Sequence, residues 1–296
     1  DSMLDMYTYG TSTRMSPECN SAPVIAATKI ENFPGGAANV ALQIDALGAA
    51  VKLVTAAEEK GALSKALKSA VVRHDSNFVT LSVKNNNPDT LKNRIYTNGV
   101  YTSRVDYDNT VDCCFSAILN AIKDQQPELL VVSDYGRGTI SDPVQLMELA
   151  KLLGIQVLVD SKKDITKYPG CYVLKQNLKE LNDWRNAAWD ITEDNFSNNL
   201  TNDSLQRYRQ TLKADNLIIT LGKSGCILVE EYETNVIPAL AMKSIDSTGA
   251  GDSFMAGLVV AISEGKSLHN ACKFATKVSS ISVTKRGTQV VTRREL

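Results

Sequence analysis

Alternating apolar and polar segments over residues 110–230 predict strands and helices that follow one another in turn. Short, almost wholly apolar runs at 129–133, 155–159 and 217–221 are typical of buried strands. Apolar residues at helical spacing lie before and between them, at 111–122 and 143–154. Strands that alternate with helices in this way form a parallel sheet that is covered on both faces. The pattern therefore predicts an α/β fold with a doubly wound, mainly parallel sheet and helices on both faces.

A second, smaller sheet is predicted near the N-terminus, where the strand-like segments are polar. Residues 94–97 and 100–103 flank Asn98-Gly99, a pair that favours a type I′ hairpin turn. Charged residues lie along both strands of this hairpin, so the two faces of its sheet cannot both be buried in a hydrophobic core. We expect a β-sheet lid with strands at about 6–32 and 90–107, within a single domain over residues 1–296.

Polar residues lie at the ends of several predicted strands, namely Asp134, Asp160, Asn177, Thr220 and the turn at Asp246. Ligands in parallel α/β folds bind outside the carboxyl ends of the strands. Each of these residues alone is more often an ordinary loop residue than a ligand contact. Their equivalent positions favour a binding site along this edge.

Residues 246–252, Asp-Ser-Thr-Gly-Ala-Gly-Asp, lie between a strand-like run at 235–239 and an apolar helical run at 254–262. Backbone N–H groups of Gly249, Ala250 and Gly251 at a helix start would form an anion hole for a phosphoryl group. Asp252 then falls in the first helical turn, where the helix dipole favours an ionised carboxylate that can accept a hydroxyl proton. The alternative is an ordinary strand-to-helix turn with an acidic residue after it.

Gly35 and Gly36 mark a second place where backbone can approach a ligand, before a helix with apolar positions at Val40 and Ile44. Asn39 projects from the first turn of that helix. It is either a ligand contact or a solvent-facing polar residue.

Composition narrows the function classes. The chain has 296 residues, 43% of them hydrophobic and 22% charged, which is ordinary for a globular protein. A net charge of −1 indicates neither a nucleic acid nor a membrane partner. The six cysteines show no metal-binding spacing, which favours reduced thiols and a cytoplasmic location. The chain begins at Asp1 without an initiator methionine, so we expect the natural N-terminus, and a first strand, to lie upstream.

Three motifs resemble those of the ribokinase-like carbohydrate kinases. Residues 34–41, PGGAANVA, resemble the family's N-terminal sugar-binding signature, and residues 246–252 resemble its C-terminal signature. Asn177-Leu178-Lys179-Glu180 is similar to the family's Asn-x-x-Glu element, which organises magnesium and phosphate through water. Residues 1–7, 14–18, 133–138 and 160–162 resemble the subgroup that phosphorylates D-glycero-β-D-manno-heptose 7-phosphate. Three positions depart from the pattern: Lys175-Gln176 replaces the usual Thr-Pro, and Thr276 replaces a common Asn.

The resemblance implies a role for each matching residue. Asp252 would be the catalytic base, with Gly249, Ala250 and Gly251 as the anion hole. The sugar would be bound by Asp5, Gly35, Gly36, Asn39 and Asp134, and the nucleotide by Asn177, Glu180, Thr220, Gly222, Gly225 and Thr248. Asn177 and Glu180 would hold Mg²⁺ through water, and the carbonyls around Asp246 and Thr248 would hold a monovalent cation such as K⁺.

A sugar that already carries a phosphate needs a cationic partner, because an unpaired dianion in a closed site is costly. The candidates are Lys92, Arg94 and Arg104 on the lid strands, Arg14 in the N-terminal segment and Lys162 after a strand. The alternative is that they are solvent-facing charges that keep a sheet edge soluble.

The function implied is ATP- and Mg²⁺-dependent phosphorylation of the anomeric hydroxyl of heptose 7-phosphate to the 1,7-bisphosphate, a step towards ADP-heptose and lipopolysaccharide precursors. Two alternatives stay open: a kinase for another sugar or sugar phosphate, and a silent sugar- or nucleotide-binding regulator. A dinucleotide-dependent oxidoreductase is disfavoured because no GxGxxG follows an early strand. Lid strands pair between subunits in several relatives, which is compatible with a homodimer, and some relatives carry a fused nucleotidyltransferase.

Overall fold

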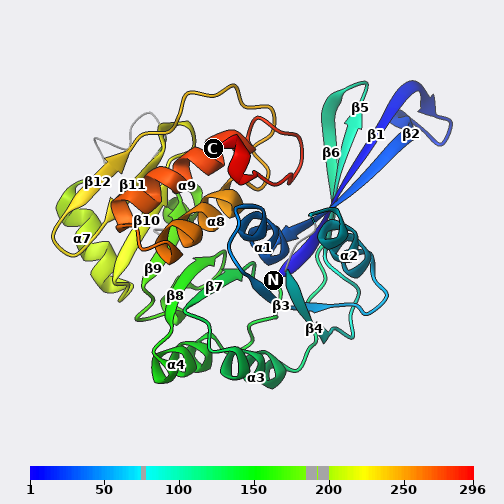
Figure 1. The fold of residues 1–296 in the computed structure, drawn as a ribbon. Helices are drawn as coiled ribbons and strands as arrows, with labels where there is room; N and C mark the ends of the chain where they lie inside the picture. The colour runs from blue at the N-terminus through cyan, green and yellow to red at the C-terminus, as the bar shows by residue number, and fades with distance from the viewer. Residues whose placement is uncertain (75–77, 185–191, 193–199) are drawn as a thin grey trace.

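A computed structural model describes residues 1–74, 78–184, 192 and 200–296 of the chain (Figure 1). The segment 183–205, whose Asn- and Asp-rich sequence predicts irregular or helical cover, lies largely outside these ranges. Within them, no helix is both long enough and apolar enough to cross a bilayer.

The main sheet confirms the predicted α/β architecture. It has the strand order β12-β11-β10-β9-β8-β7, in which β7 to β10 are parallel and β11 and β12 are antiparallel additions. The strands are β7 (Leu129–Asp134), β8 (Gln156–Ser161), β9 (Val173–Asn177), β10 (Asn216–Thr220), β11 (Cys226–Val229) and β12 (Thr234–Ile237). A separate parallel pair is formed by β3 (Lys52–Ala57) and β4 (Val79–Lys84).

Helices lie on both faces of the main sheet (Figure 1). The helices on these faces are α1 (Ala37–Ala46), α3 (Phe115–Gln125), α4 (Pro143–Leu153), α5 (Leu178–Trp184), α7 (Asn202–Thr211), α8 (Ala250–Ser263) and α9 (Leu268–Ser282). The helix α2 (Ala62–His74) packs with β3 and α1 instead. The helix α4 has the predicted ends, with Asp142 as its N-cap and Gly154 in the left-handed conformation after its last turn. The helix predicted at 111 starts only at Phe115. Residues before it belong to a loop in which the Val111 amide donates to the Arg137 carbonyl and the Asp112 amide to the Asn85 side chain.

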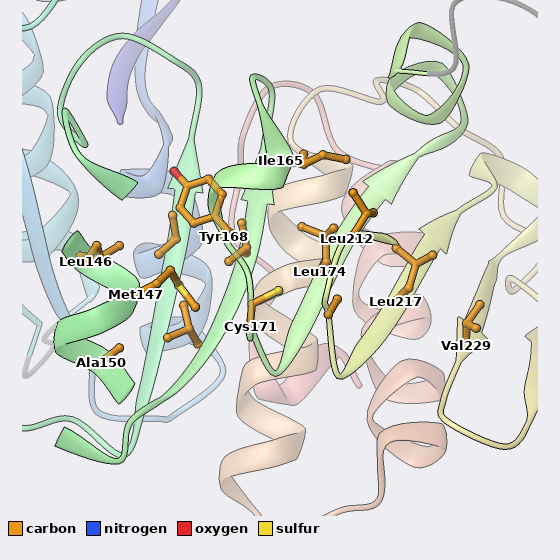
Figure 2. Close-up of a cluster of buried hydrophobic side chains, with 14 of the residues drawn as sticks. Leu146, Met147, Ala150, Ile165, Tyr168, Cys171, Leu174, Leu212, Leu217 and Val229 are labelled. Carbon is orange, nitrogen blue, oxygen red and sulfur yellow. The ribbon is translucent and has the colours of Figure 1, made fainter. Parts of the chain in front are cut away.

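The core divides along the two faces of the sheet, since successive strand residues point to opposite sides. Leu158, Val173 and Ile218 pack with side chains of α1, α8 and α9. Leu174 and Leu217 point the other way and pack with residues of α3, α4 and α7. Figure 2 labels both leucines together with Leu146, Met147 and Ala150 of α4. Both faces of the central strands are therefore buried, and only their ends are left to hold a ligand.

The lid is a four-stranded sheet that projects away from the body (Figure 1). Its strands are β1 (Ser2–Ser16), β2 (Cys19–Gly36), β5 (Leu91–Thr97) and β6 (Val100–Tyr107), in the order β2-β1-β5-β6. Asn98 and Gly99 both have positive φ, as the predicted type I′ turn requires. The first strand begins earlier than predicted and its start is buried in the body, with Leu4 fully inaccessible.

Candidate active site

The glycine turn at the start of α8 is held differently from the sequence prediction. The strand β12 ends at Ile237, two residues before the predicted strand-like run ends, and residues 238–249 separate it from α8, so the alternative of an ordinary strand-to-helix turn does not hold. The segment that follows α9 anchors the turn instead. Asp246 accepts hydrogen bonds from the amides of Thr248 (2.9 Å) and Gly287 (3.0 Å), and its own amide donates to the carbonyl of Val283.

Asp252 lies at the centre of the site with only 6% of its surface exposed. Asn39 donates to one carboxylate oxygen at 2.8 Å, and the hydroxyl of Tyr135 donates to the other at 3.0 Å. Burial raises the pKa of Asp252 to about 6, although the Asn39 hydrogen bond pulls it down. Sequence reasoning considered only the helix start, which favours the charged form, and did not foresee that burial would raise the pKa of this carboxyl. The carboxylate is still mainly ionised at neutral pH and can accept a proton.

Asn39 is not the solvent-facing residue that one interpretation allowed, since only 1% of it is exposed. Its amide nitrogen lies 2.8 Å from where a Cβ on Gly249 would stand, so a side chain there would displace it. Gly249 also has φ +77°, a conformation that favours glycine. The amide oxygen of Asn39 has no hydrogen-bond partner among the described residues. A buried acceptor beside a carboxylate is well placed to receive a ligand hydroxyl.

A cluster of four charges occupies the carboxyl ends of β8 and β9. Lys162 bridges Asp160 (2.7 Å) and Glu180 (2.5 Å), and the other oxygen of Asp160 accepts from Lys175 at 2.5 Å. The two lysines hold the pKa of Asp160 below its usual range although the carboxyl is buried. The Lys175 ammonium lies 3.1 Å from the Cβ position of Gly251. Sequence reasoning placed Asp160 at the binding edge and noted Lys175 as a departure from the family pattern. It did not predict that the two pair, because β8 and β9 become neighbours only in the assembled sheet.

A cavity of about 700 Å³ opens on one side of Asp252. It is lined by residues 249–252, by Asp160, Lys162 and Lys175 of the charged cluster, and by the predicted nucleotide contacts Asn177, Thr220 and Gly222. Gly225 does not line it: a Cβ there would stand 2.0 Å from the Ile237 carbonyl, so this glycine serves backbone packing. The structure thus brings the anion turn and three of the six predicted nucleotide contacts to one cavity, whereas Glu180, Gly225 and Thr248 do not line it.

Asn177 and Glu180 fit a magnesium ion that is held through water. Their oxygens already accept hydrogen bonds, from Lys162 and from each other's N–H groups. Within the described ranges, no group of three or more His, Cys, Asp or Glu residues is arranged to hold a metal directly. Mg²⁺ commonly keeps several waters and is bound by one or two carboxylates together with substrate phosphates, which suits this donor set.

The sugar-side candidates lie around the base of the lid. Arg94 forms an ion pair with Asp5 at 2.6 Å, and Asp5 packs against Gly35. The Lys92 ammonium lies 5.7 Å from the centre of the Tyr135 ring, so one aromatic ring separates it from Asp252. Burial lowers the pKa of Lys92, whereas nearby Asp5 raises it.

Three further sugar-side candidates, Arg104, Asp134 and Lys162, form their contacts away from the base of the lid. Arg104 pairs with Asp106 at 2.8 Å on the exposed strand β6. Both oxygens of the buried Asp134 accept hydrogen bonds, from the Gly136 amide and from the hydroxyls of Ser161 and Tyr168. These bonds hold the loop after β7, and a sugar contact from Asp134 stays a prediction. Lys162 faces the cavity from within the charged cluster, not the lid.

Tyr135 and Arg286 are residues of this site that sequence reasoning missed. Tyr135 belongs to a recognised motif, and its bond to Asp252 spans 117 positions. Arg286 follows α9 and lies against the rings of Tyr9 and Tyr96 on the lid. No local pattern pairs residues so distant in sequence.

Comparison with known proteins agrees with this geometry. A family model described as pfkB family carbohydrate kinase matches residues 3–294. The chain belongs to this family of carbohydrate kinases. It is therefore a sugar kinase, and membership implies ATP as the phosphoryl donor.

The kinase is 34% identical over 304 residues to the bifunctional protein HldE of Proteus mirabilis. This match covers the whole chain but only 61% of the relative, so the chain spans less than two thirds of the curated relatives it matches. Among solved structures, phosphofructokinase-2 of Escherichia coli in complex with potassium has a TM-score of 0.79 at 20% identity, covering 99% of this chain and 94% of that one. Ribokinase of Arabidopsis thaliana, complexed with ribose and ATP, has a TM-score of 0.75 at 18% identity, covering 100% and 95%. These structures confirm the ribokinase-like fold.

Proposed function

We propose that this kinase transfers the γ-phosphoryl group of ATP to the anomeric hydroxyl of D-glycero-β-D-manno-heptose 7-phosphate. One observation carries the proposal: Asp252 is held by Asn39 of the sugar signature and faces a cavity lined by the glycine turn. A carboxylate between a sugar contact and an anion hole is where a kinase needs its base.

The proposed reaction uses these groups in order. Asp252 takes the proton of the acceptor hydroxyl while Asn39 and Tyr135 keep the carboxylate oriented. The hydroxyl oxygen bonds to the γ-phosphorus, the bond to the β-phosphate oxygen breaks, and ADP leaves. The N–H groups of Gly249 to Gly251 stabilise the charge that develops. Asn177 and Glu180 would hold magnesium through water, and the ion would neutralise phosphate charge.

A phosphorylated acceptor is favoured by the basic residues of the lid. Arg94 lies directly opposite Arg104 in the register, and Lys92 lies two residues before Arg94 on the same face of β5. Arg94 and Arg104 are paired with Asp5 and Asp106, so a sugar phosphate dianion would take the place of these carboxylates as partner of the basic residues. Heptose as the sugar is supported by the resemblance of the motifs and by the relatives named HldE.

Two further parts of the proposal concern the surroundings of the site. The carbonyls near Asp246 and Thr248 would hold a monovalent cation, and Asp246 is already fixed beside them by backbone amides. The lid strands are the proposed surface for a homodimer, since the edge strand β6 is exposed throughout.

The test is a coupled assay of ADP release with a panel of acceptors: heptose 7-phosphate, unphosphorylated heptose, fructose 6-phosphate and ribose. We expect the highest kcat/KM with heptose 7-phosphate. ³¹P NMR of the product should show a second phosphate coupled to a single anomeric proton. Preference for another acceptor would identify a kinase for a different sugar, and no ADP release with any acceptor would favour a silent binding protein.

A further inference from the structure

Arg286 is a basic residue of the lid–body junction to which the proposed reaction assigns no role. It lies in the segment 283–288, which also anchors the glycine turn through the bond from the Gly287 amide to Asp246. In the same segment, the side chain of Thr288 comes within 3.0 Å of the Cβ position of Gly249. The hydroxyl of Thr288 donates to the carbonyl of Pro34, in the sugar signature. Arg286 therefore lies on the sugar side of the transfer site.

The lid presents a row of aromatic rings to this arginine. The guanidinium lies 5.4 Å from the ring centre of Tyr96 and 5.9 Å from that of Tyr9, two residues that face each other across β1 and β5. Both distances are within the range of cation–π attraction. Arg94 is two residues from Tyr96 on the same strand and lies 5.3 Å from the ring of Tyr7. The two guanidinium groups thus lie over one continuous aromatic surface, since the rings of Tyr7 and Tyr96 are stacked.

The basic residues near Arg286 each form an ion pair with a carboxylate, whereas Arg286 forms none with any residue that the structure describes. Lys285 pairs with Glu295 at 2.7 Å, Arg94 pairs with Asp5, and Arg104 pairs with Asp106. In the described part of the chain, no carboxylate forms an ion pair with Arg286. A guanidinium stacked on a ring through its face keeps its N–H donors at the edges, where they can bind a phosphate in a bidentate manner.

We infer that Arg286 binds the phosphate that the acceptor sugar already carries, and so selects phosphorylated sugars over free ones. The inference deepens the proposed function and rests on it in requiring a phosphorylated acceptor. The sugar would lie between Asp252 and the lid, with its reacting hydroxyl at Asp252 and its phosphate at the guanidinium. Arg286 contributes from the body and Arg94 from the lid, so a bound phosphate joins the two parts.

Titration calorimetry without nucleotide tests this directly, with heptose 7-phosphate and unphosphorylated heptose as ligands. For Arg286→Met we expect the Kd of the phosphorylated sugar to rise at least about 10-fold, while the Kd of the free sugar stays within about 2-fold. Arg286→Lys keeps the charge but loses the planar fork, so its affinity should fall between the two. Arg293→Met is the matched control, because Arg293 also stacks on a ring, that of Phe274 at 5.1 Å, remote from the site.

The outcomes separate this inference from the proposed substrate. Equal weakening for both sugars would show that Arg286 only holds the lid against the body, and unchanged affinity for both would also overturn the inference. If the kinase binds fructose 6-phosphate in place of heptose 7-phosphate and Arg286→Met weakens only that phosphorylated sugar, the proposed substrate is wrong and the inference stands. If the unaltered kinase binds no phosphorylated sugar more tightly than its free form, the inference is overturned.

Discussion

The transfer site and the lid place their functional residues in opposite ways. Asp252 and Asn39 are almost completely buried, and each is fixed by a hydrogen bond to the other. The lid residues lie on strands that are half-buried in β5 and exposed in β6, and their ion pairs are within the lid sheet itself. Groups that carry out proton transfer gain from fixed geometry, whereas groups that recognise a substrate can order when it binds. We therefore expect substitutions in the first region to act on kcat and those in the second to act on KM.

The largest effect is expected for Asp252→Asn. The change keeps the shape of the side chain but removes the proton acceptor, so kcat should fall by about 10²-fold or more. The Kd values for ATP and for the sugar should change little. Asp203→Asn is a matched control, because Asp203 also lies in the first turn of a helix but is exposed on α7. Turnover near that of the unaltered kinase would show that Asp252 is not the base.

On the lid, replacing Lys92 and Arg94 together by Met should raise the KM for the phosphorylated sugar at least about 10-fold, through loss of charge-assisted contacts. The KM for ATP should stay nearly constant, because neither residue lines the cavity of the glycine turn. Lys29→Met, at an exposed lid lysine paired with Glu31, serves as control. If kcat falls and KM is unchanged, the division between the two regions is wrong.

The burial of Asp252 should make the free energy of unfolding depend on pH. Its folded-state pKa of about 6 lies above the ordinary 3.8, so the charged form costs stability, increasingly as pH rises from about 4 to about 6 and fully above that. Asp252→Asn should therefore raise the free energy of unfolding at neutral pH by roughly 3 kcal/mol. Denaturant titrations at several pH values would measure this. A gain that persists below pH 4, or no gain at neutral pH, would contradict it.

The smallest effect concerns motion of the lid. Backbone hydrogen exchange over residues 91–107 should slow when the sugar is added, because the lid strands then close over a ligand. Exchange in the buried strand β10 should be unaffected. Equal exchange over 91–107 with and without sugar would rule out a closing lid.

These two regions also differ in how far the sequence predicted them. The glycine turn, Asp252, Asn39 and the Asn-Gly hairpin are local patterns whose physical role follows from a few adjacent residues. The alternation of apolar runs likewise predicted the sheet, because periodicity reports burial directly.

What the sequence missed depends on neighbours that are distant along the chain. The raised pKa of Asp252 arises from its burial in the assembled fold. The residues that contact its carboxylate, Asn39 and Tyr135, are 213 and 117 positions away in the sequence. The pairing of Lys175 with Asp160 follows from the order of β8 and β9, and the position of Arg286 follows from the path of the chain after α9. A sequence motif can therefore identify the residue proposed as the base, but its pKa depends on the residues that the fold brings around it.

The pH dependence of a single turnover tests the central claim, that Asp252 is a buried base at the junction of the two regions. In rapid-quench experiments with enzyme in excess over ATP, the rate should rise with pH and reach a plateau, with a midpoint near 6. Asn39→Leu should move this midpoint to higher pH, because the lost hydrogen bond stabilises the charged carboxylate. A rate independent of pH between about 5 and about 8 in the unaltered kinase would contradict the account.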